Sequence, residues 1–270
     1  MIGSNCRISA VQPVWFMAPK TILITGASSG IGAALARAHA QAYARFGVTL
    51  LLWGRDESRL QETALQCRAL GATALTQSFD LRDTAGFVAL LSAADARTPI
   101  DLAIFNAGLG GSLAKKDLAE TPANAQAIAE VNFVAPVAGA SALAGAMAKR
   151  GRGQIVLVGS ISESYPLPMA PTYAASKAGL RLFAEALGLR MKRFGVMVTL
   201  VSPGFIDTPM SRKVTEPKPF LMDADKAARI IARDIALGHR VIVVPWQFRM
   251  IRAFTELLPR AVVRWVMSRA

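Results

Sequence analysis

A glycine-rich turn joins a short β-branched run to an alanine-rich segment near the start of the chain. Residues 21–25 (T-I-L-I-T) have the composition of a strand, and residues 26–32 (G-A-S-S-G-I-G) follow directly. Residues 33–46 are typical of a helix, and a second strand is predicted at residues 48–53. Glycines let the backbone turn tightly and approach a ligand, and the N-terminus of the following helix attracts a pyrophosphate. The sequence therefore predicts a βαβ unit with an anion-binding turn at its first joint.

Alternating strand and helix patterns continue along most of the chain. Apolar runs predict further strands at residues 73–79, 100–105, 154–159, 196–202 and 241–244. Amphipathic segments predict helices at residues 57–70, 84–91, 123–150, about 171–194 and 223–237, the first of them capped by Asp56. Strands rich in Val, Ile and Leu between such helices are typical of a parallel sheet covered on both faces. We therefore expect an α/β fold with a Rossmann-like, doubly wound parallel sheet of about seven strands and helices on both faces.

Residue types with a functional character gather at the predicted carboxyl ends of the strands. In sheets of this kind, ligands bind in the crevice outside those ends. The residues that fall there are 26–32, Arg55, Asp80, Asn106, Ser160 and 203–208. Their coincidence predicts a ligand site at this edge of the sheet.

The residues after the second predicted strand bear on the choice of dinucleotide. A carboxylate there would bind the ribose hydroxyls of NAD, whereas this sequence has Gly54 and Arg55. Gly54 leaves room, and the planar guanidinium of Arg55 suits a phosphate. After the third strand, Asp80 can meet an adenine amino group. NADP is therefore favoured and NAD is the alternative, in which case Arg55 is simply solvated.

Tyr173 and Lys177 stand four residues apart in a segment that favours a helix, P-T-Y-A-A-S-K-A-G-L at residues 171–180. Side chains at i and i+4 share a helix face, so the phenol and the ammonium are predicted to be neighbours. A fixed positive charge lowers the pKa of a nearby tyrosine, which ordinarily lies near ~10. The pair is therefore a candidate general acid/base. The alternative is a surface tyrosine packed on the stem of a lysine.

Together these motifs resemble those of the short-chain dehydrogenase/reductase family of the single-domain type. The resemblance covers roughly residues 19–245 and rests on T-G-A-S-S-G-I-G at 25–32, N-A-G at 106–108, Asn132, Ser160, Y-A-A-S-K at 173–177 and P-G-F-I-D-T at 203–208. Ser160 stands thirteen residues before Tyr173, as the family pattern requires. The resemblance implies an oxidoreductase acting on CH–OH donors, with NADP as the favoured acceptor. Hydride would move between the nicotinamide C4 and a ketone, aldehyde or secondary alcohol.

The resemblance also implies roles for individual residues, with Asn132, Ser160, Tyr173 and Lys177 as the catalytic group. Tyr173 would exchange the proton at the substrate oxygen, and Ser160 would hydrogen-bond that oxygen. Lys177 would lower the pKa of Tyr173 and hold the nicotinamide ribose, while Asn132 would hold a water that connects Lys177 to solvent. The cofactor-binding residues would be Gly26, Ser28, Ser29, Gly30, Ile31, Gly32, Arg55, Asp80, Leu81, Asn106, Ala107, Gly108, Tyr173, Lys177, Pro203, Gly204, Ile206 and Thr208. No metal is expected.

Two positions depart from the family pattern. The family often has a second asparagine where this chain has Phe105, a position that supports the sheet. Ser29 stands where many NADP-preferring relatives carry a basic residue, so the NADP assignment depends on Arg55 alone.

Segments near the predicted site are mostly apolar, which favours a largely hydrophobic alcohol or ketone as substrate. The candidate residues of a substrate pocket are Leu109, Tyr165, Met169, Phe205, Phe220 and Met222. The charged side chains nearby, Glu163, Arg212, Lys213 and Lys218, are expected to be solvated.

Composition narrows the class of protein. A chain of 270 residues that is 53% hydrophobic can form one large domain, which argues against disorder. Two cysteines give neither a disulfide framework nor a metal-binding spacing, and no apolar run is expected to reach the ~20 residues that span a membrane. The net charge of +13 suits an anionic partner, but no RNA- or DNA-binding motif accompanies it, so no nucleic acid is predicted. We expect a cytoplasmic protein.

The two ends of the chain are expected to differ from the domain at residues 19–245. Residues 1–18 are predicted to be a flexible extension. Residues 246–270 form a basic, amphipathic segment, predicted as two short helices broken at Pro259. This segment would pack on its own domain, on a second subunit of a homodimer or homotetramer, or peripherally on the inner membrane surface. Two alternative functions follow: a non-catalytic NADP-binding sensor or scaffold, and a lipid-modifying reductase at a membrane surface.

Overall fold

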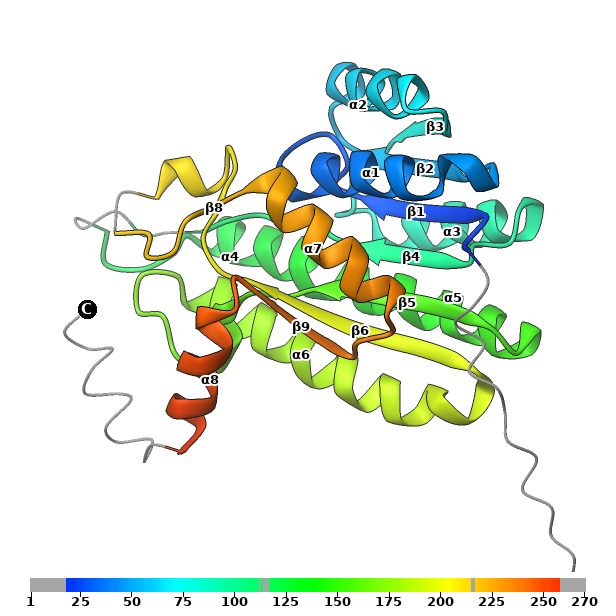
Figure 1. Cartoon of the computed structure of the whole chain (residues 1–270). Helices are drawn as coiled ribbons and strands as arrows, with labels where there is room; N and C mark the ends of the chain where they lie inside the picture. Colours follow the sequence, from blue (N-terminus) through cyan, green and yellow to red (C-terminus); the bar gives the residue numbers. More distant parts are fainter. Residues whose placement is uncertain (1–17, 112, 114–116, 215–216, 258–270) are drawn as a thin grey trace, which may run out of the picture.

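The computed structural model describes residues 18–111, 113, 117–214 and 217–257. The predicted N-terminal extension lies outside this part of the chain except for residue 18, and so does the C-terminal segment after residue 257. A twisted sheet forms the centre of the molecule, and helices lie on both of its faces (Figure 1).

All seven strands of the main sheet run parallel. They are β1 (Thr21–Thr25), β2 (Thr49–Gly54), β3 (Thr73–Ser78), β4 (Leu102–Phe105), β5 (Gly153–Val158), β6 (Val196–Pro203) and β9 (Val241–Val244). Their order in the sheet is β3-β2-β1-β4-β5-β6-β9, so the winding direction reverses between β1 and β4. The predicted Rossmann-like α/β fold with about seven parallel strands is confirmed. The crevice at this reversal is where such sheets bind ligands.

Successive side chains of a strand point to opposite faces, and this alternation creates two cores. Ile22 and Ile24 of β1 belong to a core beneath one layer of helices, whereas Leu23 belongs to the core on the other face. The first layer contains α1 (Gly30–Tyr43), α2 (Glu57–Ala69) and α7 (Ala224–Ala236). The second layer contains α3 (Thr84–Arg97), α5 (Ala135–Arg150) and α6 (Pro171–Met191). Phe105 is 3% exposed and its ring packs edge-on against Phe87, which agrees with its predicted role in supporting the sheet.

Three elements differ from the sequence-based expectation. The helix expected to end at residue 91 continues to Arg97, because Asp95 pairs with Arg150 at 2.6 Å and accepts a hydrogen bond from the Ile100 amide. The single helix expected at residues 123–150 consists of α4 (Pro122–Ala129) and α5, joined by a π-helical turn at Glu130–Val134. Residues 209–222, for which no strand or helix is expected, contain a short 3₁₀ helix at Ser211–Lys213, and Met222 begins β8 (Met222–Asp223), which pairs with β7 (Ile206–Asp207).

The helical stretch Pro122–Arg150 is long and apolar enough to span a membrane, contrary to the expectation that the chain has no such run. Length and composition alone give this result, and half of its most apolar window is buried in the protein. Leu143 and Met147 of α5 lie in the core against the sheet. The stretch therefore has the packing of a core helix.

Some helices have a side chain that caps the N-terminus, and others do not. Asp56, Asp83 and Asp223 cap α2, α3 and α7, each accepting a hydrogen bond from a backbone amide of the first turn. The cap that Asp56 was predicted to provide is thus confirmed. In the described part of the chain, no side chain caps α1, whose first turn follows Ser29. The first amides of α1 are left to bind an anion.

A buried histidine on α1 makes the stability of the fold dependent on pH. His39 is fully buried, its Nδ1 lies 2.8 Å from the Leu35 carbonyl oxygen, and burial lowers its pKa from 6.5 to about 4. Between those values the unfolded chain binds a proton that the folded protein does not, so stability falls as the pH falls from 6.5 to about 4. We expect this group to remove roughly 3 kcal/mol over that window. Urea unfolding of the wild type and His39→Leu at pH 7 and pH 4.5 checks this, because the variant lacks the titrating group. Equal losses of stability in the two proteins would contradict it.

Candidate active site

The segment after β5 brings two of the predicted catalytic residues together. β5 ends at Val158, and Ser160 begins a 3₁₀ helix at Ile161–Ser164. The Ser160 side chain hydrogen-bonds to the phenol of Tyr173, which lies in the first turn of α6. A hydroxyl and a phenol are thus joined at the carboxyl edge of the sheet. Both groups can hydrogen-bond a single substrate oxygen.

The pKa of Tyr173 is raised in this structure, contrary to the expectation that Lys177 lowers it. Burial of the phenol is the largest cause, and the charge of Glu163 adds to it, while the hydrogen bond with Ser160 acts in the opposite direction. The Lys177 ammonium lies 5.8 Å from the centre of the Tyr173 ring. It donates a hydrogen bond to the Val158 carbonyl oxygen at 2.9 Å. The phenol is therefore held in its protonated form, as a proton donor requires.

The pKa of Lys177 is also shifted. Its side chain is almost fully buried, and burial lowers its pKa from 10.5 to about 8, while the negative charge of Glu163 partly opposes the shift. A pKa near 8 leaves the ammonium mostly charged at neutral pH. Perturbed pKa values cluster at functional sites, so Tyr173 and Lys177 make this sheet edge a candidate site.

Asn132 reaches the same place from the π-helical turn. Its side-chain amide is fully buried and donates to the Leu109 carbonyl oxygen at 2.9 Å, while its oxygen accepts from the Leu109 amide at 2.7 Å. A Cβ atom added at Gly108 would lie 3.3 Å from the Asn132 oxygen and 3.7 Å from the Lys177 nitrogen. Asn132 thus holds the loop after β4 beside Lys177. Single π turns in helices occur often at functional sites, but the sequence carries no pattern that would have located this one.

The glycine turn at residues 26–32 is built for close approach of the backbone. Gly26 and Gly30 have positive φ angles of 69° and 56°, and a Cβ atom at Gly32 would lie 2.1 Å from the Gly26 carbonyl oxygen. Asn106 donates its side-chain amide to the carbonyl oxygens of Thr25 and Gly26. The Thr25 hydroxyl accepts from the amides of Asn106 and Ala107. These bonds tie the turn to the end of β4, on both sides of the sheet reversal.

The turn fits the pyrophosphate of a dinucleotide. It leads into the uncapped N-terminus of α1, whose first turn also contains no acidic residue. Thr208 approaches from the loop after β7, since a Cβ atom at Gly30 would lie 3.2 Å from its Cγ2. The residues that would hold the diphosphate and the nearby ribose are therefore brought to one edge from β1, β4 and β7.

The predicted adenine side of the site lies at the ends of β2 and β3. Gly54 adjoins Ser28, whose Oγ would lie 3.3 Å from a Cβ atom at Gly54. The Arg55 side chain is exposed, and no ion pair within 4 Å engages its guanidinium among the described residues. Asp80 forms a bidentate pair with Arg82, at 2.6 Å for the shorter contact, and this pairing lowers the pKa of Asp80. Arg55 is thus available to a phosphate, whereas Asp80 would have to share its carboxylate with an adenine amino group.

The predicted pocket residues divide among three places. Tyr165 and Phe205 lie beside α8 (Gln247–Leu257), and Phe220 is close by, with its ring 5.6 Å from that of Phe248. Met222 instead packs against the core beneath α1 and α7. The Met169 carbonyl oxygen accepts a hydrogen bond from the Leu113 amide at 2.7 Å, and Leu109 is held by Asn132. The first helix predicted for the C-terminal segment is thus present, and it borders the pocket; the second lies outside the described residues.

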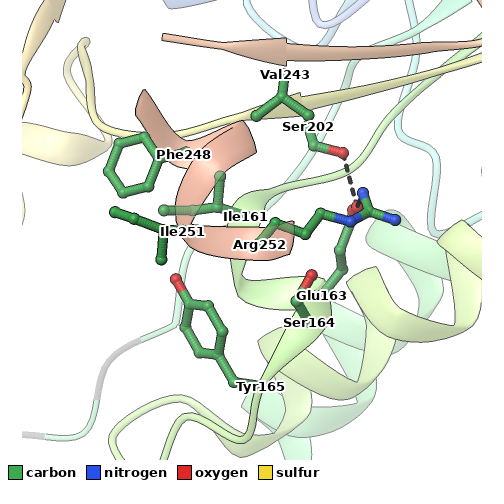
Figure 2. Close-up of a pocket in the computed structure, with 9 residues that line it drawn as sticks. All are labelled: Ile161, Glu163, Ser164, Tyr165, Ser202, Val243, Phe248, Ile251 and Arg252. Carbon is green, nitrogen blue, oxygen red and sulfur yellow. Dashed lines mark hydrogen bonds and ion pairs between the residues drawn. The ribbon is translucent and has the colours of Figure 1, made fainter. Parts of the chain in front are cut away.

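Glu163 is not solvated, and that expectation is wrong. Its side chain has no exposed surface, and it accepts hydrogen bonds from the Ser202 hydroxyl and from Arg252 of α8 (Figure 2). It also accepts one from the Ser160 amide. Arg212 and Lys213 are exposed as expected, Arg212 in a surface pair with Asp207. The sequence did carry a signal for the position of Glu163, because Ser160 and Glu163 have the S-x-x-E spacing of a capping box. Both hydrogen bonds of that capping box are formed in the structure.

The doubly wound parallel sheet has, at one edge, a glycine turn suited to binding phosphate. Ser160, Tyr173 and Lys177 lie at the same edge. This arrangement defines a nucleotide-dependent oxidoreductase. Comparison with known proteins agrees with this class. The sequence pattern of the family described as short chain dehydrogenase matches residues 20–219. The chain belongs to the short-chain dehydrogenase family.

Individual relatives resemble it over most of its length. An uncharacterised oxidoreductase of Myxococcus xanthus is 32% identical over 244 residues, which are 90% of this chain and 94% of that protein. A ketoacyl reductase of Nostoc is 34% identical over 205 residues, 74% of this chain and 69% of that protein. The structure of a short-chain dehydrogenase from Sphingobium yanoikuyae in complex with NADPH superimposes with a TM-score of 0.75 and 26% identity, covering 89% of this chain and 97% of that one.

Proposed function

We propose that the protein is an NADP-dependent oxidoreductase that interconverts a mostly apolar ketone or aldehyde and its alcohol, with Tyr173 as general acid/base. The observation that carries the proposal is the hydrogen-bonded Ser160–Tyr173 pair beside Lys177, at the sheet edge that also holds the glycine turn. NADPH is favoured because Arg55 is exposed at the end of β2 and because the structurally similar Sphingobium enzyme was solved with NADPH.

Each group has one task in the proposed reaction. When bound, NADPH would supply the hydride that is added to the carbonyl carbon. The Ser160 hydroxyl would orient the carbonyl oxygen, and Tyr173 would donate its proton to that oxygen. The Lys177 ammonium would stabilise the resulting phenolate and hold the nicotinamide ribose. In the oxidative direction, the phenolate would take the proton back from the alcohol.

The cofactor would be held by residues from several strand ends. The amides of Gly30, Ile31 and Gly32 would bind the pyrophosphate, and Arg55 the 2′-phosphate. Asn106 and Gly108 would approach a ribose, and Ile206 and Thr208 the nicotinamide carboxamide. The proposal for the substrate is coarser: an apolar carbonyl compound, with ketoacyl compounds as the first to test because a relative is a ketoacyl reductase.

The proposal is tested by following NADPH oxidation against a panel of ketones, ketoacyl thioesters and aldehydes. We expect Arg55→Ala to raise the KM for NADPH by about tenfold or more, because a charge-assisted contact to the 2′-phosphate is lost. The KM for NADH should not change. Arg59→Ala is the matched control, since Arg59 is exposed and already paired with Asp56 at 3.3 Å. Equal effects of Arg55→Ala on the two cofactors would contradict the assignment to NADP.

Two alternatives are separated by the same assay and one addition. Tight NADPH binding without turnover of any carbonyl compound would favour the sensor or scaffold. Met250 and Phe254 of α8 and Trp246, which directly precedes it, form an apolar face and are each about two-thirds exposed. Burial of this face in a homodimer or homotetramer, or contact with an anionic membrane, remains a prediction. Gel filtration and sedimentation with anionic vesicles distinguish the two.

A further inference from the structure

The C-terminal helix α8 inserts a charged side chain toward the segment that carries Ser160. α8 follows β9 and packs against the end of that strand and the 3₁₀ helix Ile161–Ser164, and Arg252 points inward from it toward Glu163 (Figure 2). Their charged atoms, Arg252 Nη1 and Glu163 Oε1, lie 3.1 Å apart. The Glu163 side chain is fully buried and that of Arg252 is 21% exposed, so solvent screens this ion pair little.

Glu163 connects α8 to the predicted catalytic serine. One carboxylate oxygen accepts from Arg252 and from the Ser202 hydroxyl at 2.7 Å, at the end of β6. The other oxygen accepts from the Ser160 amide at 3.2 Å. The Ser160 hydroxyl in turn accepts from the Ser162 amide and hydrogen-bonds to Tyr173. A chain of direct contacts therefore runs from α8 to the phenol.

Arg252 is the only ion-pair partner that lies within 4 Å of Glu163 among the described residues. Four other titratable groups interact electrostatically with Glu163 over a longer range than Arg252 does. They are Arg181 and Lys177 of α6, Tyr173 and Tyr165. A buried carboxylate that loses its counter-ion either moves toward water or takes up a proton. Either change alters the hydrogen bond that fixes the Ser160 backbone.

Apolar contacts hold α8 in the position that this pair requires. Phe248 is 5% exposed and sits so close to Gly204 that a Cβ atom there would lie 2.4 Å from the ring. Its ring also meets those of Phe205 and Phe220 edge-on. A cavity lined by Ile161, Tyr165, Val243 and Ile251, among others, adjoins the ion pair. Phe248 and Arg252, one turn apart, thus form the inward face of the helix.

We infer that Glu163 and Arg252 are positioning residues for the reaction: α8, through this ion pair, holds Ser160 in the orientation that pairs with Tyr173 and receives the substrate oxygen. The inference rests on the proposed function and deepens it. It assigns the ion pair of α8 to the active site, with a role in turnover; the residues predicted to bind the pyrophosphate and the 2′-phosphate, 26–32 and Arg55, lie beyond the sheet reversal at the ends of β1 and β2.

The test compares Arg252→Met, Arg252→Lys and Arg249→Ala with the wild type. Methionine retains an apolar stem but no charge, and lysine retains the charge. Arg249 is exposed on the same helix and serves as the matched control. We expect Arg252→Met to lower kcat for ketone reduction at least tenfold with the dissociation constant for NADPH unchanged within twofold. Arg252→Lys should restore much of kcat, and Arg249→Ala should match the wild type.

A second measurement works without turnover. The chain has three tyrosines, so protein labelled with ¹³Cζ-tyrosine gives three signals, and Tyr173→Phe assigns the one of interest. Arg252→Met should shift the Tyr173 signal because the hydrogen bond from Ser160 changes. If the wild type reduces no carbonyl compound, the proposed function fails, and this signal still tests the positioning. A wild-type kcat together with an unmoved Tyr173 signal in Arg252→Met would overturn the inference. If that variant does not fold, Glu163→Gln, which abolishes the ion pair, is judged by the same two readouts.

Discussion

Tyr173→Phe is expected to lower kcat for ketone reduction by about 10³-fold, the range of a lost general acid. The variant loses only the hydroxyl that hydrogen-bonds to Ser160, and the remaining ring keeps its packing beside Lys177. Binding of NADPH should stay within about twofold of the wild type, because the glycine turn and Arg55 lie on other elements. Steady-state kinetics and fluorescence titration with NADPH measure the two quantities.

Tyr43→Phe is the control for this experiment. Tyr43 ends α1, packs against the core on the opposite face of the sheet and has no place in the proposed reaction. It should leave kcat unchanged. A Tyr173→Phe enzyme that keeps a tenth or more of the wild-type kcat would mean that another group delivers the proton.

Gly32→Ala is expected to weaken NADPH binding by at least ~100-fold, the scale of effect that displacement of a site by about 1 Å produces. A Cβ atom at this position would lie 2.1 Å from the Gly26 carbonyl oxygen and 2.5 Å from the Asn106 amide nitrogen. Neither neighbour can yield easily, because Asn106 is held by Thr25 and Gly26. The turn must open, and the amides at the start of α1 then move away from the pyrophosphate. Isothermal titration with NADPH measures the loss.

Gly145→Ala provides the comparison. Gly145 lies within α5, and a Cβ atom there would have no neighbour within 4 Å. Alanine in a helix interior should stabilise the protein by about 0.5–1 kcal/mol and leave NADPH binding unchanged. If Gly32→Ala bound NADPH as tightly as Gly145→Ala does, the glycine turn would not be the pyrophosphate site.

Local composition was sufficient to predict the sheet and most of the helices. The strands β1, β2 and β6 are mostly apolar, because a parallel strand in the middle of the sheet is buried on both faces. Asp56 was recognisable as a cap from its position alone, and its bond to the Arg59 amide confirms it. The end of α3 was not predictable, since Asp95 is held by Arg150 from 55 residues away. Only the folded chain creates that contact.

The candidate site, like the fold, could be predicted from the sequence only in part. The positions of Ser160, Tyr173 and Lys177 could be inferred because spacing along a strand end and a helix determines them. The pKa shifts of Tyr173 and Lys177 could not be inferred from spacing, because they depend on burial in the folded protein. Burial raises the pKa of Tyr173 and lowers that of Lys177. Glu163 was expected at the surface because carboxylates usually lie there. Its counter-ion is 89 residues further along the chain.

The separation between Glu163 and Arg252 also bears on how the protein is made. During synthesis, β1 to β6 leave the ribosome and can pair before residue 252 has emerged. Until then the Glu163 carboxylate has no counter-ion from α8, and a buried, uncompensated charge opposes closure of the segment at residues 160–164. We therefore expect the nascent chain to acquire its sheet early, and the serine segment to reach its final conformation after residue 252 has emerged.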